Sequence, residues 1–341
     1  MMHVTSQESW KTKLQKVFLR NNVRLLMVLL AVFVIACILN PEIFLSFNNL
    51  QSMCKQLPEY GVMSIAMTLA MIAGGIDLSL VANANLTAIF AATILKMQPT
   101  GSDAGDILVA CLVALICGTI FGLINGSFIA FLHIPPMLAT LGMQQLLRGI
   151  SVVITSGRAV SSLPMAFSLF GNKSLFGKIP YLFIVFLLVV VASYFLLSKT
   201  KYGMRLFMMG TNPLAARYAG INNAAVIIVT HGIAGLLAAV SGLIFTVRFN
   251  SAKPDNGNSY TMQCILVSVL GGVNPNGGHG SIGGVVLAVF ILQVLSSALN
   301  TFSNLSSFYR DLLWGSALIL VMILNHTLDN RNERRLIASL K

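Results

Sequence analysis

The chain has 341 residues, of which 56% are hydrophobic and only 9% are charged. An ordinary soluble domain is roughly 45–50% apolar and about 25% charged, so this composition excludes a soluble globular protein. The mean hydropathy of +0.82 and the regular succession of apolar runs instead predict an all-α, polytopic membrane protein. Because one crossing takes about 20 apolar residues, the length predicts about ten transmembrane helices in a single transmembrane domain, residues 1–341.

The formal net charge of +12 could indicate a nucleic-acid-binding protein, but the positions of the charges indicate a membrane topology instead. Basic residues gather in three segments, 1–24, 198–223 and 326–341. The positive-inside rule places such segments in the cytoplasm, so both termini and the central connection are predicted to be cytoplasmic. Since no alternation of aromatic and basic residues marks a nucleic-acid surface, nucleic acid is not an expected partner.

Ten apolar runs are predicted as membrane crossings, with polar connections between them. They cover residues 25–39, 59–73, 80–95, 107–130, 137–154, 181–197, 224–245, 262–270, 282–299 and 312–324. Counted from a cytoplasmic start, this order places the connection 198–223 and the C-terminal segment on the inner side, as the charge pattern also requires.

Glycine pairs interrupt the hydrophobic pattern once in each half of the chain. Gly74-Gly75 leads to Ile76-Asp77, and Gly271-Gly272 leads to a Val-Asn pair. Paired glycine-interrupted hydrophobic segments are typical of inverted repeats that form a pathway where their helices break. The sequence therefore predicts two inverted-repeat-like halves that are broken at the Gly-Gly segments.

Asp77 is the carboxylate expected to lie within the membrane span, where an ionised side chain costs about 2.5–3.5 kcal/mol. The preceding glycines let the backbone leave the helix, and Asp77 can then accept free amide hydrogens of the next helix, so an N-cap is the favoured interpretation. A direct role in the permeation path, together with Ser79 of the same break, and a proton relay are the alternatives.

Three further features have both a structural and a functional interpretation. Arg148 is expected to extend its head to the outer interface rather than to contact solute or a partner. His231 is expected to be hydrogen-bonded inside the bundle rather than catalytic. Small residues recur in the seventh crossing, and packing within the fold is favoured for them over a dimer seam. They are Gly232, Gly235, Ala238, Ala239 and Gly242.

The sequence contains none of the motifs that indicate an enzyme or an energy source of its own. It has no GxxxxGK[ST] phosphate loop, no HExxH pair and no GxSxG with triad partners. Its five cysteines show no CxxC pair and no histidine spacing that predicts a metal site. No catalytic residue, metal or cofactor is therefore expected in this chain.

Several ordered motifs carry a family resemblance. The central connection reads TKYGMR at 200–205 and GTNPLAARYAGI at 210–221. Further matches are AGGIDLS at 73–79, NG at 125–126, IPP at 134–136, ATLG at 139–142 and GGHGS at 277–281. With these motifs the chain resembles the ribose-type permeases of bacterial ABC importers from about residue 48 to 314. The resemblance implies a monosaccharide or related small polyol as the solute, and it places Asn125 with the helix breaks along the translocation path.

In this family the segment 212–219 would be the coupling helix, which docks on the ATPase subunit, with Gly210 just before it. The residues fit a short helix, because Asn212-Pro213 can start one and Gly220 can end it. Ala215 and Ala216 would allow close approach of the partner, and Arg217 would add charged hydrogen bonds at the rim. A bundle connection without a partner is the alternative.

The sequence departs from the family pattern at two places near the expected pathway. After the motif at 73–79, the family usually has a Val-Gly pair, whereas this chain has Leu80 and Val81. Where the family commonly has a Glu and an Asp at the entry to the eighth crossing, this chain has Thr261 and Gln263.

The resemblance implies a permease subunit of the bacterial inner membrane that pairs with a second copy of itself, within membrane lipid, with the solute path at or near the dimer axis. Cytoplasmic ABC ATPase subunits would bind ATP and Mg and drive transport. A periplasmic sugar-binding protein would dock on the outer connections 48–58, 156–178 and 250–260. An ion-coupled secondary carrier of a small polar solute, with Asp77 as its titratable group, is the alternative.

Overall fold

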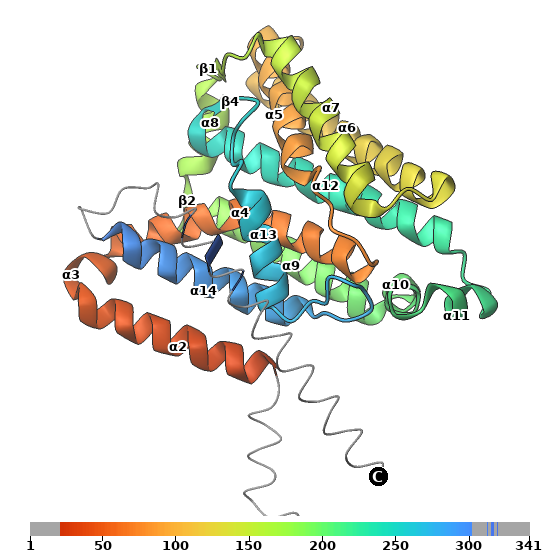
Figure 1. The fold of residues 1–341 in the computed structure, drawn as a ribbon. Coiled ribbons are helices and arrows are strands. Elements are labelled where there is room, and N and C mark those ends of the chain that lie inside the picture. The colour runs from red at the N-terminus through yellow and green to blue at the C-terminus, as the bar shows by residue number, and fades with distance from the viewer. Residues whose placement is uncertain (1–20, 302–311, 313–314, 317–318, 320–341) are drawn as a thin grey trace, which may run out of the picture.

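The structure is a computed structural model that describes residues 21–301 together with 312, 315, 316 and 319 (Figure 1). The helices are α2 (Asn21–Leu39), α3 (Pro41–Phe44), α4 (Phe47–Ile72), α5 (Leu80–Met97), α6 (Asp103–Leu132), α7 (Pro136–Thr155), α8 (Met165–Asn172), α9 (Tyr181–Lys199), α10 (Lys201–Thr211), α11 (Pro213–Tyr218), α12 (Asn223–Phe249), α13 (Tyr260–Leu270) and α14 (Ile282–Asn300). Two short antiparallel pairs join β1 (Val160–Ser161) to β4 (Ser251–Ala252) and β2 (Ser174–Leu175) to β3 (Ile179–Pro180).

Among the described residues, seven helices are long and apolar enough to cross a membrane. They are α2, α5, α6, α7, α9, α12 and α14. Each of them coincides with one predicted crossing, and their ends differ from the predicted ends by no more than four residues. These seven predictions are confirmed, and the chain is a helical multi-pass membrane protein.

The other three predicted crossings have different outcomes. The second lies in α4, which begins twelve residues before the predicted start. Polar residues are frequent in the first ten positions of α4, so a search for apolar runs does not detect this part of the helix. The eighth corresponds to α13, whose 11 residues extend only about 16 Å and cannot cross a core of about 30 Å alone. Most of the tenth, 312–324, falls outside the described residues.

The connections separate into two groups at opposite ends of the bundle. At one end, the amide of Gly278 donates to the carbonyl of Ile72 (3.0 Å), and the Thr140 hydroxyl donates to the carbonyl of Ile76 (3.1 Å). At the other end, β1 pairs with β4, and Gln51 Nε2 donates to Ser174 Oγ (3.1 Å). Figure 1 shows α10 and α11 at the first end and β1, β4 and α8 at the second. This grouping is the one that the alternating direction of crossings two to nine predicts.

α6 and α12 pack together through glycines. A Cβ atom at Gly122 would overlap the carbonyl of His231, and one at Gly235 would overlap the carbonyl of Gly118. Gly242 lies in the same way against the backbone of Ala84 in α5. Small residues let helix backbones approach closely, so the predicted role of the small residues of α12 in packing within the fold is confirmed.

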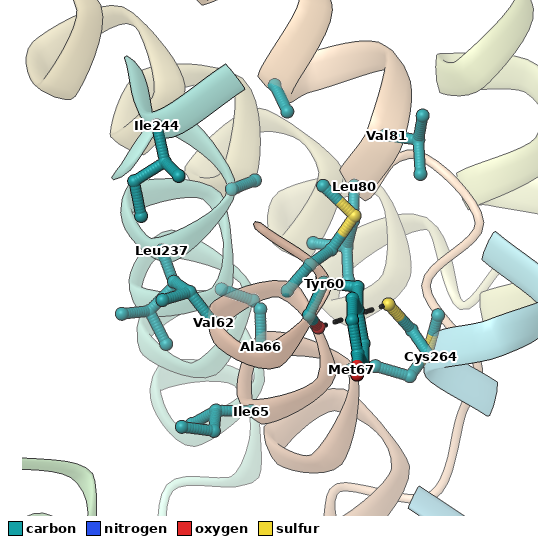
Figure 2. Packing of buried hydrophobic residues seen from close by; sticks show 14 of the residues in the cluster. Tyr60, Val62, Ile65, Ala66, Met67, Leu80, Val81, Leu237, Ile244 and Cys264 are labelled. Atoms are coloured by element: carbon teal, nitrogen blue, oxygen red, sulfur yellow. Dashed lines mark hydrogen bonds between the residues drawn. The ribbon is translucent and has the colours of Figure 1, made fainter. Parts of the chain in front are cut away.

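α4 is the central helix of the bundle. All of its residues from Leu57 to Ile72 are buried. Figure 2 shows it between Leu237 and Ile244 of α12 on one side and Cys264 of α13 on the other, where the cysteine thiol lies 3.6 Å from the carbonyl oxygen of Tyr60. A helix that is apolar all round and enclosed by neighbours forms the core on which the surrounding helices pack.

The glycine packing predicts opposite effects of the same substitution at two positions. Gly235→Ala should lower the free energy of unfolding by about 1–3 kcal/mol, because the added methyl group forces α6 and α12 apart. Gly149→Ala, in α7 with no atom within 4 Å of the new methyl group, should be neutral or stabilise the helix by up to about 1 kcal/mol. Thermal unfolding in detergent measures both effects, and equal stability of the two variants would contradict the packing.

Candidate functional site

The predicted coupling segment is a short, capped helix at one end of the bundle. Asn212 Oδ1 accepts a hydrogen bond from the amide of Ala215 (2.9 Å), and Pro213 occupies the first helical position. Gly220 adopts a left-handed backbone (φ +80°) just past the end of α11, where glycine is the favoured residue. The predicted start and end of this helix are therefore confirmed.

The burial of α11 differs from the prediction for one of its two alanines. Ala216 is buried in the core of this chain, so it is not available for close approach by a partner; Ala215 and Arg217 are exposed as expected. The large apolar side chains that α11 presents outward are Leu214, 63% exposed, and Tyr218, 85% exposed. Sequence reasoning missed both, although their i, i+4 spacing places them on one helix face.

The segment before α11 packs against the first glycine break. Gly210, at the C-terminal end of α10, lies against the carbonyl of Ile72 and the backbone of Gly278. Gly277 in turn packs against Gly74, and both have a left-handed backbone with φ of +100°. Gly75 lies against Pro136 at the start of α7. The structure thus brings the predicted break at 74–75 together with the coupling segment.

The second predicted glycine pair lies elsewhere. Gly271 packs against the backbone of Gly284 and Val285 in α14, and its carbonyl accepts a hydrogen bond from Asn21 Nδ2 (3.0 Å). Gly272 (φ +86°) lies against the same asparagine. This pair therefore joins α13 to α2 and α14 and does not meet the first break.

Asp77 is the centre of a buried polar cluster. Its Oδ1 accepts hydrogen bonds from the amide (2.9 Å) and hydroxyl (2.6 Å) of Ser79, and its Oδ2 lies 2.9 Å from His231 Nδ1. Asn125 Nδ2 lies 3.5 Å from both carboxylate oxygens and 3.3 Å from Ser79 Oγ. The predicted N-cap role of Asp77 is wrong: α5 begins at Leu80 with Ser79 as its cap residue, and Asp77 accepts from the amide of Ser79 in the turn before the helix. The prediction that His231 is hydrogen-bonded inside the bundle is confirmed.

This cluster joins three elements that are far apart in sequence: the turn between α4 and α5, α6 through Asn125, and α12 through His231. The exposed fractions of Asp77 and His231 are 2% and 3%. A buried carboxylate needs hydrogen bonds from several neighbours, and this one receives them from each element. The cluster therefore fixes the α4–α5 turn against α12.

α10, α11 and the start of α12 are hydrogen-bonded to one another. Asn223 Nδ2 donates to the carbonyl of Pro213 (2.8 Å), and the Tyr202 hydroxyl lies 2.7 Å from Thr230 Oγ1. Burial raises the pKa of Tyr202 to about 12, opposed by the bond to Thr230, so the phenol stays protonated at neutral pH. His231 follows Thr230 directly, so a continuous set of contacts runs from α10 and α11 through α12 to Asp77.

A second buried cluster was not predicted from the sequence. Glu59, in the middle of α4, is fully buried and forms an ion pair with Arg248 of α12, and the Tyr260 hydroxyl donates to its second oxygen (2.8 Å). The sequence placed Glu59 at the start of the second predicted crossing and Arg248 just beyond the end of the seventh, because both flank apolar runs. The sequence did not indicate that α4 begins at Phe47, which places Glu59 in the middle of the helix.

Arg148 is exposed on α7, as expected for a side chain that extends away from the bundle. Among the described residues, no group of three His, Cys, Asp or Glu side chains lies close enough together to hold a metal ion.

The chain matches a known transport family over most of its length. Residues 49–324 match the family described as branched-chain amino acid transport system / permease component. The chain belongs to this family. It is therefore a transporter component rather than an enzyme. No solved structure matches the chain significantly.

Individual relatives confirm the resemblance to ribose-type permeases. The chain is 31% identical to the ribose import permease protein RbsC of Escherichia coli over 90% of this chain and 93% of that protein. It is 33% identical to the ribose import permease protein RbsC of Bacillus subtilis, over 86% and 88% of the two chains. It is 30% identical to the autoinducer 2 import system permease protein LsrD of Yersinia pestis, over 77% and 78%.

The contact between Asp77 and His231 predicts a measurable coupling between them. Each alanine variant leaves a buried polar partner without its hydrogen bond. The loss in free energy of unfolding in the double variant should therefore be smaller, by about 1–3 kcal/mol, than the sum of the losses in the two single variants. A double-mutant cycle in detergent measures this. The exposed pair Lys253 and Asp255, 3.6 Å apart, is the matched control and should show less than about 1 kcal/mol. Additive effects at 77 and 231 would contradict the contact.

Proposed function

We propose that this chain is the transmembrane permease subunit of an ABC importer that translocates a monosaccharide or a related small polyol. The curated relatives over most of the chain are import permeases for ribose and autoinducer 2. The sequence has no phosphate loop, so ATP and Mg are bound, and ATP is hydrolysed, in a separate ATPase subunit, and this chain holds no cofactor.

One observation supports the ATPase partner most directly. α11 is a capped helix that presents Leu214 and Tyr218 outward, and it is hydrogen-bonded through Pro213 to the start of α12. Large exposed apolar and aromatic side chains on a rigid element are typical of interface anchors. Closure of an ATPase subunit that is bound to this face would move α12 and, through His231, the α4–α5 turn.

The position of the exposed basic residues supports the membrane orientation. The end that carries α10 and α11 also carries Lys199, Lys201, Arg205 and Arg217, all of them exposed. We assign this end to the cytoplasm on the positive-inside rule, with both termini on the same side and ten crossings in total, in the inner membrane of a bacterium. The opposite end, with β1, β4 and α8, is then the docking face for a periplasmic sugar-binding protein.

Two copies of the chain complete the transporter, with the solute path at or near the dimer axis. The small residues of α12 do not form this dimer seam, because they pack against α6 and α5 of the same chain. The whole chain then acts as a single transmembrane domain, with 198–223 as its coupling segment.

The rival function is an ion-coupled carrier, and the buried pair of Asp77 and His231 is the feature that favours it. Uptake in vesicles separates the two. An ABC importer takes up solute only with ATP, its ATPase and its binding protein, and it is insensitive to an ionophore. Uptake by the isolated chain that an ionophore abolishes would establish the carrier instead.

The α11 face predicts the effect of two surface substitutions. Leu214→Ser and Tyr218→Ser should each reduce ATP-driven uptake at least tenfold, a loss of about 1.4 kcal/mol or more in ATPase docking, without lowering membrane insertion or thermal stability. Tyr194→Ser, at a 52% exposed tyrosine of α9, is the matched control and should transport normally. Normal uptake by both α11 variants would contradict the coupling role.

A further inference from the structure

A polar cavity lies between α4, α13 and α14, apart from the coupling end. Its volume is about 50 Å³. Six of its seven lining side chains carry an amide or hydroxyl group. The lining residues are Gln56, Tyr60, Tyr260, Gln263, Leu292, Gln293 and Ser296.

The cavity holds hydrogen-bonding groups that have no partner in the part of the chain that the structure describes. Gln293 is 2% exposed; its Oε1 accepts a hydrogen bond from the Tyr60 hydroxyl (3.0 Å), and its Nε2 has no acceptor among the described residues. Within the same part of the chain, the side chains of Gln56, Gln263 and Ser296 form no hydrogen bond. Gln293 is buried, whereas Gln56, Gln263 and Ser296 are half-buried, so their amides and hydroxyl are open to water or to a solute that enters the cavity.

The cavity lies in the half of the bundle nearer the β1–β4 end. Gln56 is five residues after Gln51, which contacts Ser174 at that end, and Tyr260 is the first residue of α13. Polar side chains are costly where lipid surrounds them, so amides and hydroxyls that share a cavity are suited to line a solute path that opens from this end. A second cavity of about 290 Å³, between α6, α8, α9 and α12, is lined almost entirely by apolar side chains such as Phe167 and Val247. Polarity is therefore a particular property of the first cavity.

The wall formed by Tyr260 is held in place from behind. Its hydroxyl donates a hydrogen bond to Glu59. The centroid of its ring lies 5.4 Å from the ring centroid of Phe245 and 6.1 Å from that of Tyr60. The charge of Glu59 is paired with Arg248, so no uncompensated charge adjoins the cavity. The site thus offers amides, hydroxyls and aromatic ring surface without net charge.

We infer that this cavity is a solute-contact site for a neutral polyhydroxyl compound, shown here in its closed form. The inference rests on the proposed function. Glutamine amides can donate to and accept from sugar hydroxyls, and a tyrosine ring can pack on the C–H face of a sugar. A zwitterionic or ionic solute would need opposite charges that the lining does not supply.

The cavity must widen to admit such a solute. About 50 Å³ holds one or two water molecules, each of which takes about 30 Å³ in the liquid, but not a sugar ring. α13 is the element suited to move, because it is only 11 residues long and lies between two glycines with left-handed backbone, Gly257 (φ +62°) and Gly272 (φ +86°).

The experiment uses the complete transporter, with its ATPase and binding protein, in proteoliposomes. Uptake of radiolabelled D-ribose, or of whichever member of a panel of neutral pentoses and hexoses the wild type takes up, is measured beside ATP hydrolysis. Gln263→Leu and Gln293→Leu should lower the solute taken up per ATP hydrolysed at least tenfold, while ATP hydrolysis stays within twofold of wild type. Gln145→Leu, an exposed glutamine of α7, is the matched control and should change neither quantity.

Each other outcome identifies which statement fails. Wild-type coupling in both leucine variants overturns the solute-contact site. If the leucine variants lose both activities by misfolding, Gln263→Asn and Gln293→Asn, which keep the amide and shorten the side chain, replace them, and wild-type uptake per ATP in these variants overturns the site. Absence of ATP-driven uptake of every neutral sugar by the wild type overturns the proposed function instead.

Discussion

The close approach of α12 to α6 is the constraint on which the rest of the structure depends. Glycines on both helices bring the two backbones into direct contact, and this contact sets the position of His231 opposite Asp77. In lipid no water can satisfy a displaced carboxylate or imidazole, so the helices must hold both groups within hydrogen-bond distance. Backbone proximity and polar pairing therefore stabilise the same arrangement.

α12 also connects the two polar regions of the molecule. His231 near one end reaches the α4–α5 turn, and Arg248 near the other end reaches Glu59. The two positions are 17 residues apart, about 25 Å along a helix. A single rigid helix thus links the coupling end with the region of the polar cavity; the ion pair between Arg248 and Glu59 holds it to α4, and the hydrogen bond between His231 and Asp77 holds it to the turn that follows α4.

Apolar run length was enough to predict the seven long helices, because each of them is apolar on average over the length of a membrane crossing. It failed at α4 and α13, where the surroundings are protein rather than lipid, and where polar residues such as Glu59 and Gln263 are accommodated by tertiary contacts. The capping residues Asn212 and Gly220 act locally and were predicted correctly. The inward position of Ala216 depends on packing that the sequence does not express.

The segment between α12 and α13 is fastened to α5 by one side chain. Asn85 Nδ2 donates to the carbonyls of Pro254 (3.0 Å) and Asn256 (2.9 Å), which satisfies irregular backbone inside the bundle. The first turn of α13 is additionally tethered by Tyr260 to Glu59. Both ends of α13 are therefore fastened, the leading end to α4 and α5 and the trailing end, at Gly271, to α2 and α14, so any rearrangement of this helix involves all four neighbours.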